Sequence, residues 1–577
     1  MLDLAKRPFY LNAEQIHWVK DTLAHLTTEQ KAGQLFCVMG GDYGKDELRE
    51  LVAKSRVGGI LFRPAPAEEI RENYRLLDEV APVPLLKAAN LEEGGAGATT
   101  DGTLFGWPMM VGAANDDGMV EKFGKVCAAE GQSVGVNWTF SPVCDIDMNY
   151  RNPITNVRTY GSDKEKVKKN TQIYVEAVQK CGVAACAKHF PGDGVDYRDH
   201  HLHPTYNSLS AEEWYNSYGA VYQNLIEHDL LSIMVGHIVQ PAVQMEIDPK
   251  LSFADCLPAS QSRELLTGVL REKFGFNGVI TTDATIMGGY CMSMERRKAI
   301  PASIMAGCDM IVFNTNLYED YFYILEGLKT GLLTEERLDE AVTRILALKV
   351  KVCGAGKDRT CPGQSIDGNG ACNGNTQEHS AEDSAGAQDM ILAQAAGWHR
   401  ECADKSVTLV KNLAPQVLPV TIEKYPQIRL ITLGKDEIPG GSMAETAIEL
   451  LRQRGFAVEH YQPFADDLHG CADLPKNRLT LYLANYEQAS NQTTVRINWC
   501  PKHALDSPRF LNEEDCIFVS LANPYLLQDV PRVKTYINAY TATKMTIEAV
   551  IEKLMGESEF KGISPADAFC GLPDTRI

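Results

Sequence analysis

One stretch of the sequence gathers most of the side chains that could carry out chemistry. Residues 183–204, VAACAKHFPGDGVDYRDHHLHP, begin with a short apolar run that is typical of a buried strand. A loop broken by Gly and Pro follows, and the stretch contains these titratable residues: Lys188, His189, Asp193, Asp196, Asp199, His200, His201 and His203. So many titratable groups directly after a buried strand are costly unless they take part in chemistry. The alternative is a solvated surface loop that is rich in His by chance.

Polar side chains also follow other short apolar runs. In chain order they are Asn90 with Glu92 and Glu93, Asp145 and Asp147, Arg158 on the following loop, Lys188 and His189, His237, Asp283, and Asn314. In a barrel, catalytic groups come from the C-terminal ends of strands and from the loops after them, so these residues are expected to meet at one mouth. For Asp283, in GVITTDATIMGG, the alternative is a cap of the next helix.

The elements that must position these residues alternate along the chain. The apolar runs occupy residues 33–39, 58–63, 84–90, 136–146, 183–190, 230–238, 278–284 and 308–314. Helix-like segments lie between most of them, and residues 14–30 also have helical spacing. Strands that alternate with helices indicate a parallel sheet, and eight such units predict an α/β fold with an N-terminal (β/α)8 TIM-like barrel. The alternative is an open doubly wound sheet.

The pattern changes after the barrel. Residues 354–395 are rich in Gly, Ser, Asn and acids and have few large apolar side chains, which predicts a linker or a loosely ordered insertion. A second series of strands and helices begins near residue 400 and contains no phosphate-binding glycine motif. We therefore expect a TIM-barrel catalytic domain over residues 1–352, a linker over 353–398, and a smaller αβα sandwich domain over 399–577.

Composition limits the partners of this protein. The chain has 577 residues with 56 Lys and Arg against 76 Asp and Glu, a net charge of −20, which argues against nucleic acid or an anionic membrane as partner. It has no run of 18 apolar residues, and the N-terminus does not resemble a signal peptide. The 16 Cys form no C-x-x-C pair, so we expect reduced thiols in a cytoplasmic protein, monomeric or homodimeric, without a metal or cofactor.

The central stretch resembles a known family. Lys188-His189-Phe190-Pro191-Gly192 followed by Asp199-His200-His201 is similar to the signature of glycoside hydrolase family 3, and above all to its bacterial β-N-acetylglucosaminidases, which read KHFPGHG and then Asp-Ser-His. The resemblance covers most of residues 30–350 and, more faintly, residues 400–577. It implies a barrel-like N-terminal domain followed by a smaller αβα sandwich.

The resemblance also implies roles for individual residues. Asp283 would be the nucleophile that attacks the anomeric carbon, and His201, held by Asp199, would act as general acid and then as general base. A carboxylate that accepts from one imidazole nitrogen fixes the tautomer and raises the basicity of the ring, which suits that role. His200 and His203 are neighbours that could take the place of His201, and His200 is the alternate that we keep.

Further residues match family positions that contact the sugar. They are Lys188, His189 and Arg158, while His237 is a further candidate for substrate binding; the alternative for Arg158 is a surface salt bridge. Two departures stand out. Asp193 replaces a family His, and Asn90-Leu91-Glu92-Glu93-Gly94-Gly95 replaces the family's D-x-E-G-G, so Asn90 or Glu92 would substitute for the Asp that grips sugar hydroxyls.

The sequence thus predicts a retaining exo-β-glycosidase that removes terminal β-linked N-acetylhexosamine, expected to be N-acetylglucosamine, from small saccharides. One alternative is a phosphorylase, because a neutral or cationic His repels phosphate less than a carboxylate does. Another is a β-glucosidase-like enzyme whose acid/base is a Glu of the C-terminal domain. From a different class, a non-catalytic sugar-binding protein on an inherited barrel also remains open.

Overall fold

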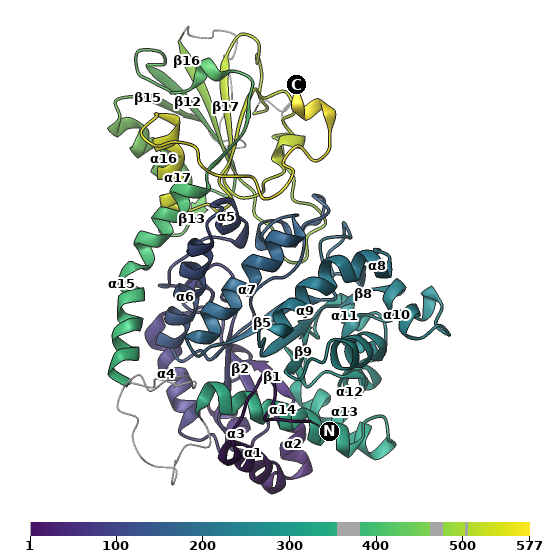
Figure 1. The fold of residues 1–577 in the computed structure, drawn as a ribbon. Helices are drawn as coiled ribbons and strands as arrows, with labels where there is room; N and C mark the ends of the chain where they lie inside the picture. Colours follow the sequence, from purple (N-terminus) through teal and green to yellow (C-terminus); the bar gives the residue numbers. More distant parts are fainter. Residues whose placement is uncertain (1, 355–380, 462–476, 502–505) are drawn as a thin grey trace. The chain divides into compact units, whose positions relative to one another are not determined.

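The computed structural model describes residues 2–354, 381–461, 477–501 and 506–577 (Figure 1). These residues form two compact units. The first comprises Met1–Thr103, Glu121–Ile146 and Val167–Ala395, and the second comprises Leu104–Val120, Asp147–Lys166 and Ala396–Ile577. Two segments from the first third of the chain therefore belong to the C-terminal unit, which the predicted domain boundaries at residues 352 and 399 do not take into account.

The first unit is built on a closed barrel of parallel strands, as the alternation of strands and helices predicts. Around the barrel the order is β1-β10-β9-β7-β5-β4-β3-β2. The strands are β1 (Phe36–Met39), β2 (Gly59–Leu61), β3 (Leu86–Ala89), β4 (Trp138–Thr139), β5 (Ala184–Phe190), β7 (Ser232–Val235), β9 (Val279–Ala284) and β10 (Met310–Val312). Closure of the barrel excludes the open doubly wound sheet.

Helical segments connect successive barrel strands (Figure 1). In chain order they are α3 (Lys45–Ala53), α4 (Ala67–Asp78), α6 (Asp117–Ser133), α7 (Lys164–Lys180), α9 (Ala220–Glu227), η7 (Glu264–Lys273) and α12 (Arg296–Ala306), with α13 (Leu317–Thr330) and α14 (Glu335–Cys353) after the last strand. Because these helices cover the outside and side chains fill the inside, the strands are buried on both faces. All seven residues of β5, for example, are buried.

The predicted helix over residues 14–30 is two helices instead. They are α1 (Ala13–His25) and α2 (Thr28–Gln34), and each begins at its own capping box. At the second one, the Thr27 hydroxyl accepts from the backbone N–H of Gln30 at 3.2 Å, while the Gln30 side chain accepts from the backbone N–H of Thr27 at 3.0 Å. A Thr three residues before a Gln starts a new helix, and this local signal interrupts the helical spacing.

A buried ion cluster, here called the base cluster, lies where β10 begins. Asp309, directly before the strand, accepts from Arg271 at 2.6 Å and from Arg337 at 2.7 Å, and Arg344 lies 3.4 Å away. Its Oδ2 also accepts from the backbone N–H of Ile280 at 2.9 Å. Burial opposes ionisation, but the three guanidinium groups outweigh it and lower the pKa of Asp309. The cluster therefore ties η7 and α14 to the start of β9 and β10.

The second unit contains a six-stranded sheet in the order β11-β18-β17-β16-β12-β15. Among the described strands of this sheet, only β11 and β18 pair in the antiparallel sense. The strands are β11 (Thr408–Asn412), β12 (Gln427–Gly434), β15 (Ala457–Tyr461), β16 (Arg478–Asn485), β17 (Asp515–Ser520) and β18 (Thr535–Asn538). Helices α16 (Met443–Gln453) and α17 (Lys544–Leu554) pack on each other. A separate α/β sheet domain therefore follows the barrel, as expected.

Part of the predicted linker is helical. Residues 355–380 lie outside the described residues, but α15 (Ala381–Ser406) covers the last part of the segment 353–398. The lack of large apolar side chains favoured a loose segment, whereas its alanines, such as Ala385, Ala387 and Ala393, have the highest helix propensity of any residue. Among the described residues, none of the helices is long and apolar enough to cross a membrane.

Candidate active site

The polar residues of the central stretch meet at the C-terminal ends of the barrel strands. Lys188 and His189 are the last polar residues of β5, and Asp283 is the penultimate residue of β9. Asn90 directly follows β3, and His237 lies two residues after β7. A parallel barrel brings all its strand ends to one face, so residues far apart in sequence become neighbours there. We call this group, with the loop that carries His200 and His201, the mouth cluster.

The loop after β5 is held in place by buried hydrogen bonds. The Tyr218 hydroxyl donates to the backbone carbonyl of Asp193 at 2.6 Å and lies 3.0 Å from that of Ile146. Gly192 has a φ of 118°, and a Cβ at this position would lie 2.0 Å from the Tyr218 ring. Only glycine fits both the positive φ and the close ring. The KHFPG motif therefore has a steric reason for its glycine.

Lys188 forms a buried pair with an acidic residue from the loop after β3. Its Nζ forms an ion pair with Glu92, and it lies 3.4 Å from Oδ1 of Asn90. The side chains of Lys188 and Glu92 are 4% and 9% exposed. Burial of both charges is tolerated because they are paired. The structure thus brings together three residues that the sequence assigns to sugar binding, and both candidates for the missing Asp, Asn90 and Glu92, lie beside Lys188.

His189 is oriented by Asp145, from the segment after β4. Asp145 Oδ2 accepts from His189 Nδ1 at 2.7 Å, and Oδ1 accepts from the backbone N–H groups of His189 at 3.2 Å and Asp193 at 2.8 Å. An ionised carboxylate only accepts, so the proton of the neutral ring sits on Nδ1. Nε2 of His189 then faces Oδ2 of Asp283 at 3.9 Å. Sequence reasoning noted Asp145 as a strand end but gave it no partner.

Asp283 is an ionised carboxylate surrounded by imidazole rings. Burial favours its neutral form, but the electrostatic attraction of the surrounding histidines, above all His189 and His200, outweighs this and lowers the pKa of Asp283. Its Oδ1 accepts from the backbone N–H of Ala284 at 2.7 Å. The side chain is 13% exposed, which leaves it open on one side. A deprotonated, partly accessible carboxylate at a strand end has the properties of a nucleophile.

His201 and Asp199 form the dyad that the resemblance implies. Oδ1 of Asp199 accepts from His201 Nδ1 at 2.7 Å and from the His201 backbone N–H at 2.8 Å. Burial works against the carboxylate, but these hydrogen bonds and the charge of His201 lower the pKa of Asp199. The His201 ring is 22% exposed while the Asp199 carboxylate is fully buried. Nε2 is therefore the nitrogen left to exchange a proton with a ligand.

His200, the alternate for His201, occupies a different place. Its ring is fully buried, with Nε2 3.7 Å from Oδ2 of Asp283 and Nδ1 3.7 Å from Oδ2 of Asp193. Burial and the neighbouring rings of His201 and His189 lower the pKa of His200 well below its usual value. The two departures from the family signature, Asp193 and His200, thus face each other. The sequence shows both substitutions, but only the fold shows that they pair.

His237 is held by hydrogen bonds on both ring nitrogens. The backbone carbonyl of Ala284 accepts from Nε2 at 3.1 Å, which leaves Nδ1 to accept from the Ser260 hydroxyl at 2.9 Å. Burial lowers the pKa of His237 to about 4, so the ring is neutral. These bonds connect it to the residue after Asp283, and substrate binding by His237 stays a prediction.

Two other predicted strand-end residues belong to the second unit. Arg158 ends the short helix η3 (Asn156–Arg158), and its Nη1 donates to the backbone carbonyl of Ile154 at 3.4 Å. Asp147 is buried and accepts from the Tyr525 hydroxyl and from the Thr155 hydroxyl, the latter at 3.1 Å. Sugar binding by Arg158 stays a prediction.

His203 is a predicted neighbour of the dyad. Its Nδ1 lies 3.3 Å from the backbone carbonyl oxygen of Pro204.

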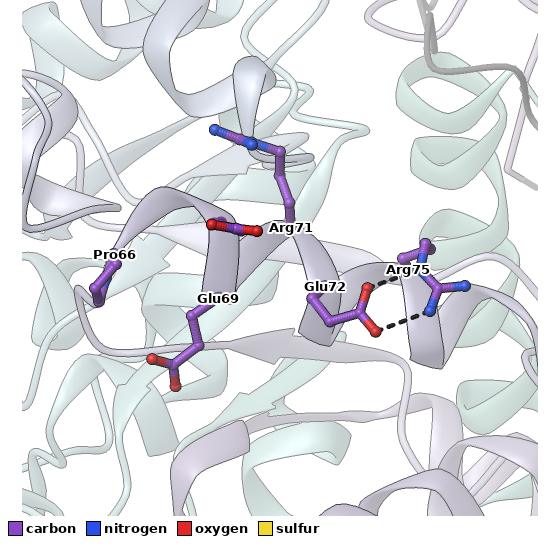
Figure 2. Close-up of a pocket in the computed structure, with 6 residues that line it drawn as sticks. Pro66, Glu69, Arg71, Glu72 and Arg75 are labelled. Carbon is purple, nitrogen blue, oxygen red and sulfur yellow. Dashed lines mark hydrogen bonds and ion pairs between the residues drawn. The ribbon is translucent and has the colours of Figure 1, made fainter.

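A surface depression on α4 differs from the mouth cluster in its lining residues (Figure 2). It is lined by Pro66, Glu68, Glu69, Arg71, Glu72 and Arg75. Glu72 accepts from Arg75 twice, at 2.8 Å each, one turn apart on the same helix. Exposed pairs of this kind contribute little and are common on solvated helices. The depression contains none of the mouth residues and shows no sign of chemistry.

Fold and site together define a class of protein. A (β/α)8 barrel whose mouth holds an ionised Asp, a carboxylate-backed His and a buried Lys–Glu pair has the parts of a barrel glycosidase. Residues 27–348 match the family model "Glycosyl hydrolase family 3 N terminal domain". The chain belongs to glycoside hydrolase family 3 and is a glycosidase that acts on β-linked sugars.

Relatives support the assignment along the whole chain. The chain is 40% identical over 587 residues to a "Beta-N-acetylglucosaminidase/beta-glucosidase" of Cellulomonas fimi, with 100% of both sequences covered. It is 41% identical to a solved "Beta-glucoside phosphorylase BglX", with a TM-score of 0.89 and 99% of each chain covered. A family 3 β-N-acetylglucosaminidase from Paenibacillus sp. str. FPU-7 shares the fold at 23% identity, with a TM-score of 0.74, covering 94% of this chain and 99% of that one.

Proposed function

We propose that the protein is a retaining exo-β-glycosidase that releases terminal N-acetylglucosamine from small saccharides through a covalent intermediate on Asp283. The observation that carries the proposal is the pairing of two differently tuned groups at one barrel mouth. Asp283 is ionised among histidines, while His201 is backed by Asp199 and keeps one ring nitrogen for proton exchange. Groups with such separate protonation states suit nucleophilic and acid–base roles in one reaction.

The reaction proceeds in two displacements at the anomeric carbon. In the first, Asp283 forms a bond to this carbon while His201 protonates the departing glycosidic oxygen. In the second, water attacks the same carbon, His201 takes its proton, and the Asp283–sugar bond breaks. Asp199 holds the ring in one tautomer and stabilises its cationic form, which gives up its proton in the first step and re-forms in the second. Two inversions return the sugar in its original β configuration.

The sugar ring would be held by the residues around Lys188. A buried ammonium beside the oxygens of Glu92 and Asn90 offers donors and acceptors at fixed positions, as hydroxyl recognition requires. His189, whose Nδ1 is held by Asp145, would contribute its second nitrogen. Arg158 is proposed as a further contact on the resemblance alone. The glycone stays a proposal because the Cellulomonas fimi relative is named for both N-acetylglucosamine and glucose substrates.

Phosphorolysis is the second candidate, and a specific finding favours it. The solved relative at 41% identity over 99% of the chain is named a β-glucoside phosphorylase. In that reaction a phosphate oxygen attacks the anomeric carbon and the Asp283 carboxylate departs, so no proton has to be removed from the acceptor. A His at the acid/base position suits an anionic acceptor, because a second carboxylate there would repel phosphate.

The experiment is a screen of 4-nitrophenyl β-N-acetylglucosaminide, β-N-acetylgalactosaminide and β-glucoside, in phosphate and in phosphate-free buffer. Wild type, Asp283→Ala and His201→Ala are compared, and the sugar product is separated as free sugar or sugar 1-phosphate. N-acetylglucosaminide turnover that is lost in Asp283→Ala and reduced in His201→Ala supports the proposal. Sugar 1-phosphate formed only with phosphate identifies a phosphorylase.

Two other outcomes would favour the remaining alternatives. Turnover of the glucoside alone, with His201→Ala as active as wild type, would move the acid/base to another residue, such as a Glu of the C-terminal unit. Failure to turn over any of the three substrates, with binding of the free sugars retained in calorimetry, would favour a non-catalytic sugar-binding protein.

A further inference from the structure

Three potential ligand atoms converge at the centre of the mouth cluster. Nε2 of His189 and Nε2 of His200 face the same oxygen, Oδ2 of Asp283, at 3.9 and 3.7 Å. One ligand atom from each of the three residues can be chosen so that all lie within 4.8 Å of one another. The two imidazole rings stand nearly perpendicular, with an interplanar angle of 85° and centroids 5.2 Å apart. Their nitrogens thus approach the carboxylate from different directions.

The hydrogen-bond pattern directs a ring lone pair toward this centre. Asp145 accepts from His189 Nδ1, so Nε2 of the neutral ring presents a lone pair toward the Asp283 carboxylate. Among the described residues, neither ring nitrogen of the fully buried His200 has a hydrogen-bond partner. Both Nε2 atoms thus lie beyond hydrogen-bonding distance of the Asp283 oxygen, which leaves room for a small cation between the three side chains.

We propose that His189, His200 and Asp283 form a binding site for a late first-row divalent cation such as Zn²⁺, and that the bound cation caps the Asp283 carboxylate and blocks its reaction with sugar. Two imidazoles and one carboxylate are the ligands that these metals prefer. The site shares His189 and Asp283 with the proposed sugar site, and the block rests on the proposed role of Asp283, but metal binding depends on neither the glycone nor the acceptor.

The distances suit a small cation. Zn–N and Zn–O bonds of about 2.0–2.2 Å place the ligand atoms of a tetrahedral site about 3.4 Å apart. The observed separations of 3.7 and 3.9 Å from Asp283 Oδ2 exceed this slightly, and small ring movements would close the difference. The Asp283 side chain is 13% exposed, so a cation can reach it along the path of the substrate. Three protein ligands would leave the fourth coordination position of a tetrahedral ion to water.

The residues behind the histidines also resemble a metal site. Metal-binding histidines usually donate their second ring nitrogen to a carboxylate, which fixes the ring and raises its basicity. Asp145 does so for His189 at 2.7 Å, and Asp193 Oδ2 stands 3.7 Å from Nδ1 of His200. This chain has Asp193 where the family signature has His, and His200 where the signature has Ser. These two differences supply both the ring of His200 and the carboxylate behind it.

The test measures binding without substrate. Full-length protein is freed of metal with a chelator and titrated with ZnCl₂ by calorimetry, and with CoCl₂ by visible absorption. We expect one tight site, with Zn²⁺ affinity strongly reduced in His200→Ser and in Asp283→Asn. Asp193→Asn should weaken the affinity by about 10–100-fold, the usual cost of losing a carboxylate behind a metal-bound His. His203→Asn is the matched control from the same loop and should bind Zn²⁺ as wild type does.

Contrary outcomes are equally clear. Unchanged Zn²⁺ affinity in both His200→Ser and Asp283→Asn would overturn the proposal, as would a near-ultraviolet thiolate-to-cobalt band, which would assign the metal to cysteines. No Zn²⁺ binding at all would overturn it as well. Thermal melting checks that each variant folds, and His200→Ser introduces the residue found in the family signature. Binding is read without sugar, so failure of the proposed glycosidase reaction would not affect the result.

Inhibition supplies a second readout. Zn²⁺ should inhibit wild-type turnover of whichever aryl glycoside the screen identifies, competitively with that substrate, and a chelator should restore activity. In His203→Asn the inhibition constant should match that of wild type. Inhibition that is not competitive with substrate would contradict capping of Asp283.

Discussion

The two ends of the barrel handle buried charge in opposite ways. In the base cluster, the oxygens of Asp309 meet guanidinium groups at 2.6 and 2.7 Å. In the mouth cluster, Oδ2 of Asp283 has imidazole nitrogens only at 3.7 and 3.9 Å, beyond hydrogen-bonding distance. The charge of Asp309 is paired within the protein, whereas the charge of Asp283 is left accessible to a ligand. Close pairing of a carboxylate with basic side chains thus stabilises the base of the barrel. At the mouth, looser pairing leaves the carboxylate available for reaction.

Removing the central carboxylate of the mouth should have the largest effect. Asp283→Ala is expected to lower kcat on the order of 10⁴-fold or more, the scale seen when a nucleophile is deleted from a hydrolase. The melting temperature should change little, because Oδ2 of Asp283 has no nitrogen within hydrogen-bonding distance that the variant would leave unpaired. Steady-state kinetics and thermal melting check the two parts. A marked loss of stability would contradict the contrast between the two ends.

Loss of the carboxylate behind the proposed acid/base should come next. Asp199→Asn removes the charge that fixes the His201 tautomer, and kcat should fall by about 10²–10⁴-fold, the range of acid–base catalysis. The pH profile should change together with kcat, while KM changes little. A pH–rate series on both proteins tests this. An unchanged pH profile would mean that Asp199 has only a structural role.

The equivalent change at the base should affect stability instead. Asp309→Ala leaves Arg271, Arg337 and Arg344 buried without their common partner, and should lower the free energy of unfolding by about 3–5 kcal/mol. Chemical denaturation measures the loss. Any variant protein that remains folded should keep a near-normal KM, because the base cluster touches none of the mouth residues named here. If Asp309→Ala kept its stability but lost its activity, the proposed contrast between a stabilising base and a reactive mouth would be wrong.

The base cluster should also sensitise the protein to acid. The folded-state pKa of Asp309 is lowered, so its stabilising contribution is complete above the ordinary Asp pKa of about 3.9 and is lost as pH falls through the lower folded value. Wild type should therefore lose more stability than Asp309→Asn between about pH 4 and pH 2. Denaturation midpoints at several pH values give the comparison. Parallel curves for the two proteins would exclude this coupling.

The smallest effect is expected at the depression on α4 (Figure 2). Arg75→Ala removes the exposed pairs with Glu72 and Glu79 and should change neither melting temperature nor kinetics measurably, since solvent screens such pairs. It serves as the surface control for the buried substitutions. A clear loss of activity in this variant would show that the depression matters for function.

Much of the fold could be predicted because its signals are local. Each of the eight apolar runs contains one barrel strand, and the C-terminal strand and helix patterns reappear as a separate sheet unit. Where prediction failed, another local signal outweighed the one used. The capping box at Thr27 divides the predicted first helix into two. The high helix propensity of alanine favours α15 in a segment that is poor in large apolar residues. The assignment of residues 104–120 and 147–166 to the second unit depends on contacts distant in sequence.

The sequence by itself determined the barrel, the family and the identity of the residues at the strand ends. It also showed the Asp199/His201 pair, because those residues are two positions apart and their contact is local. The tertiary structure alone decided which distant residues became partners. Asp145 with His189, Glu92 with Lys188, and His200 with Asp283 are joined only because parallel strands end at one face of a closed barrel. The spacing of these residues in the sequence does not indicate the distances between their side chains.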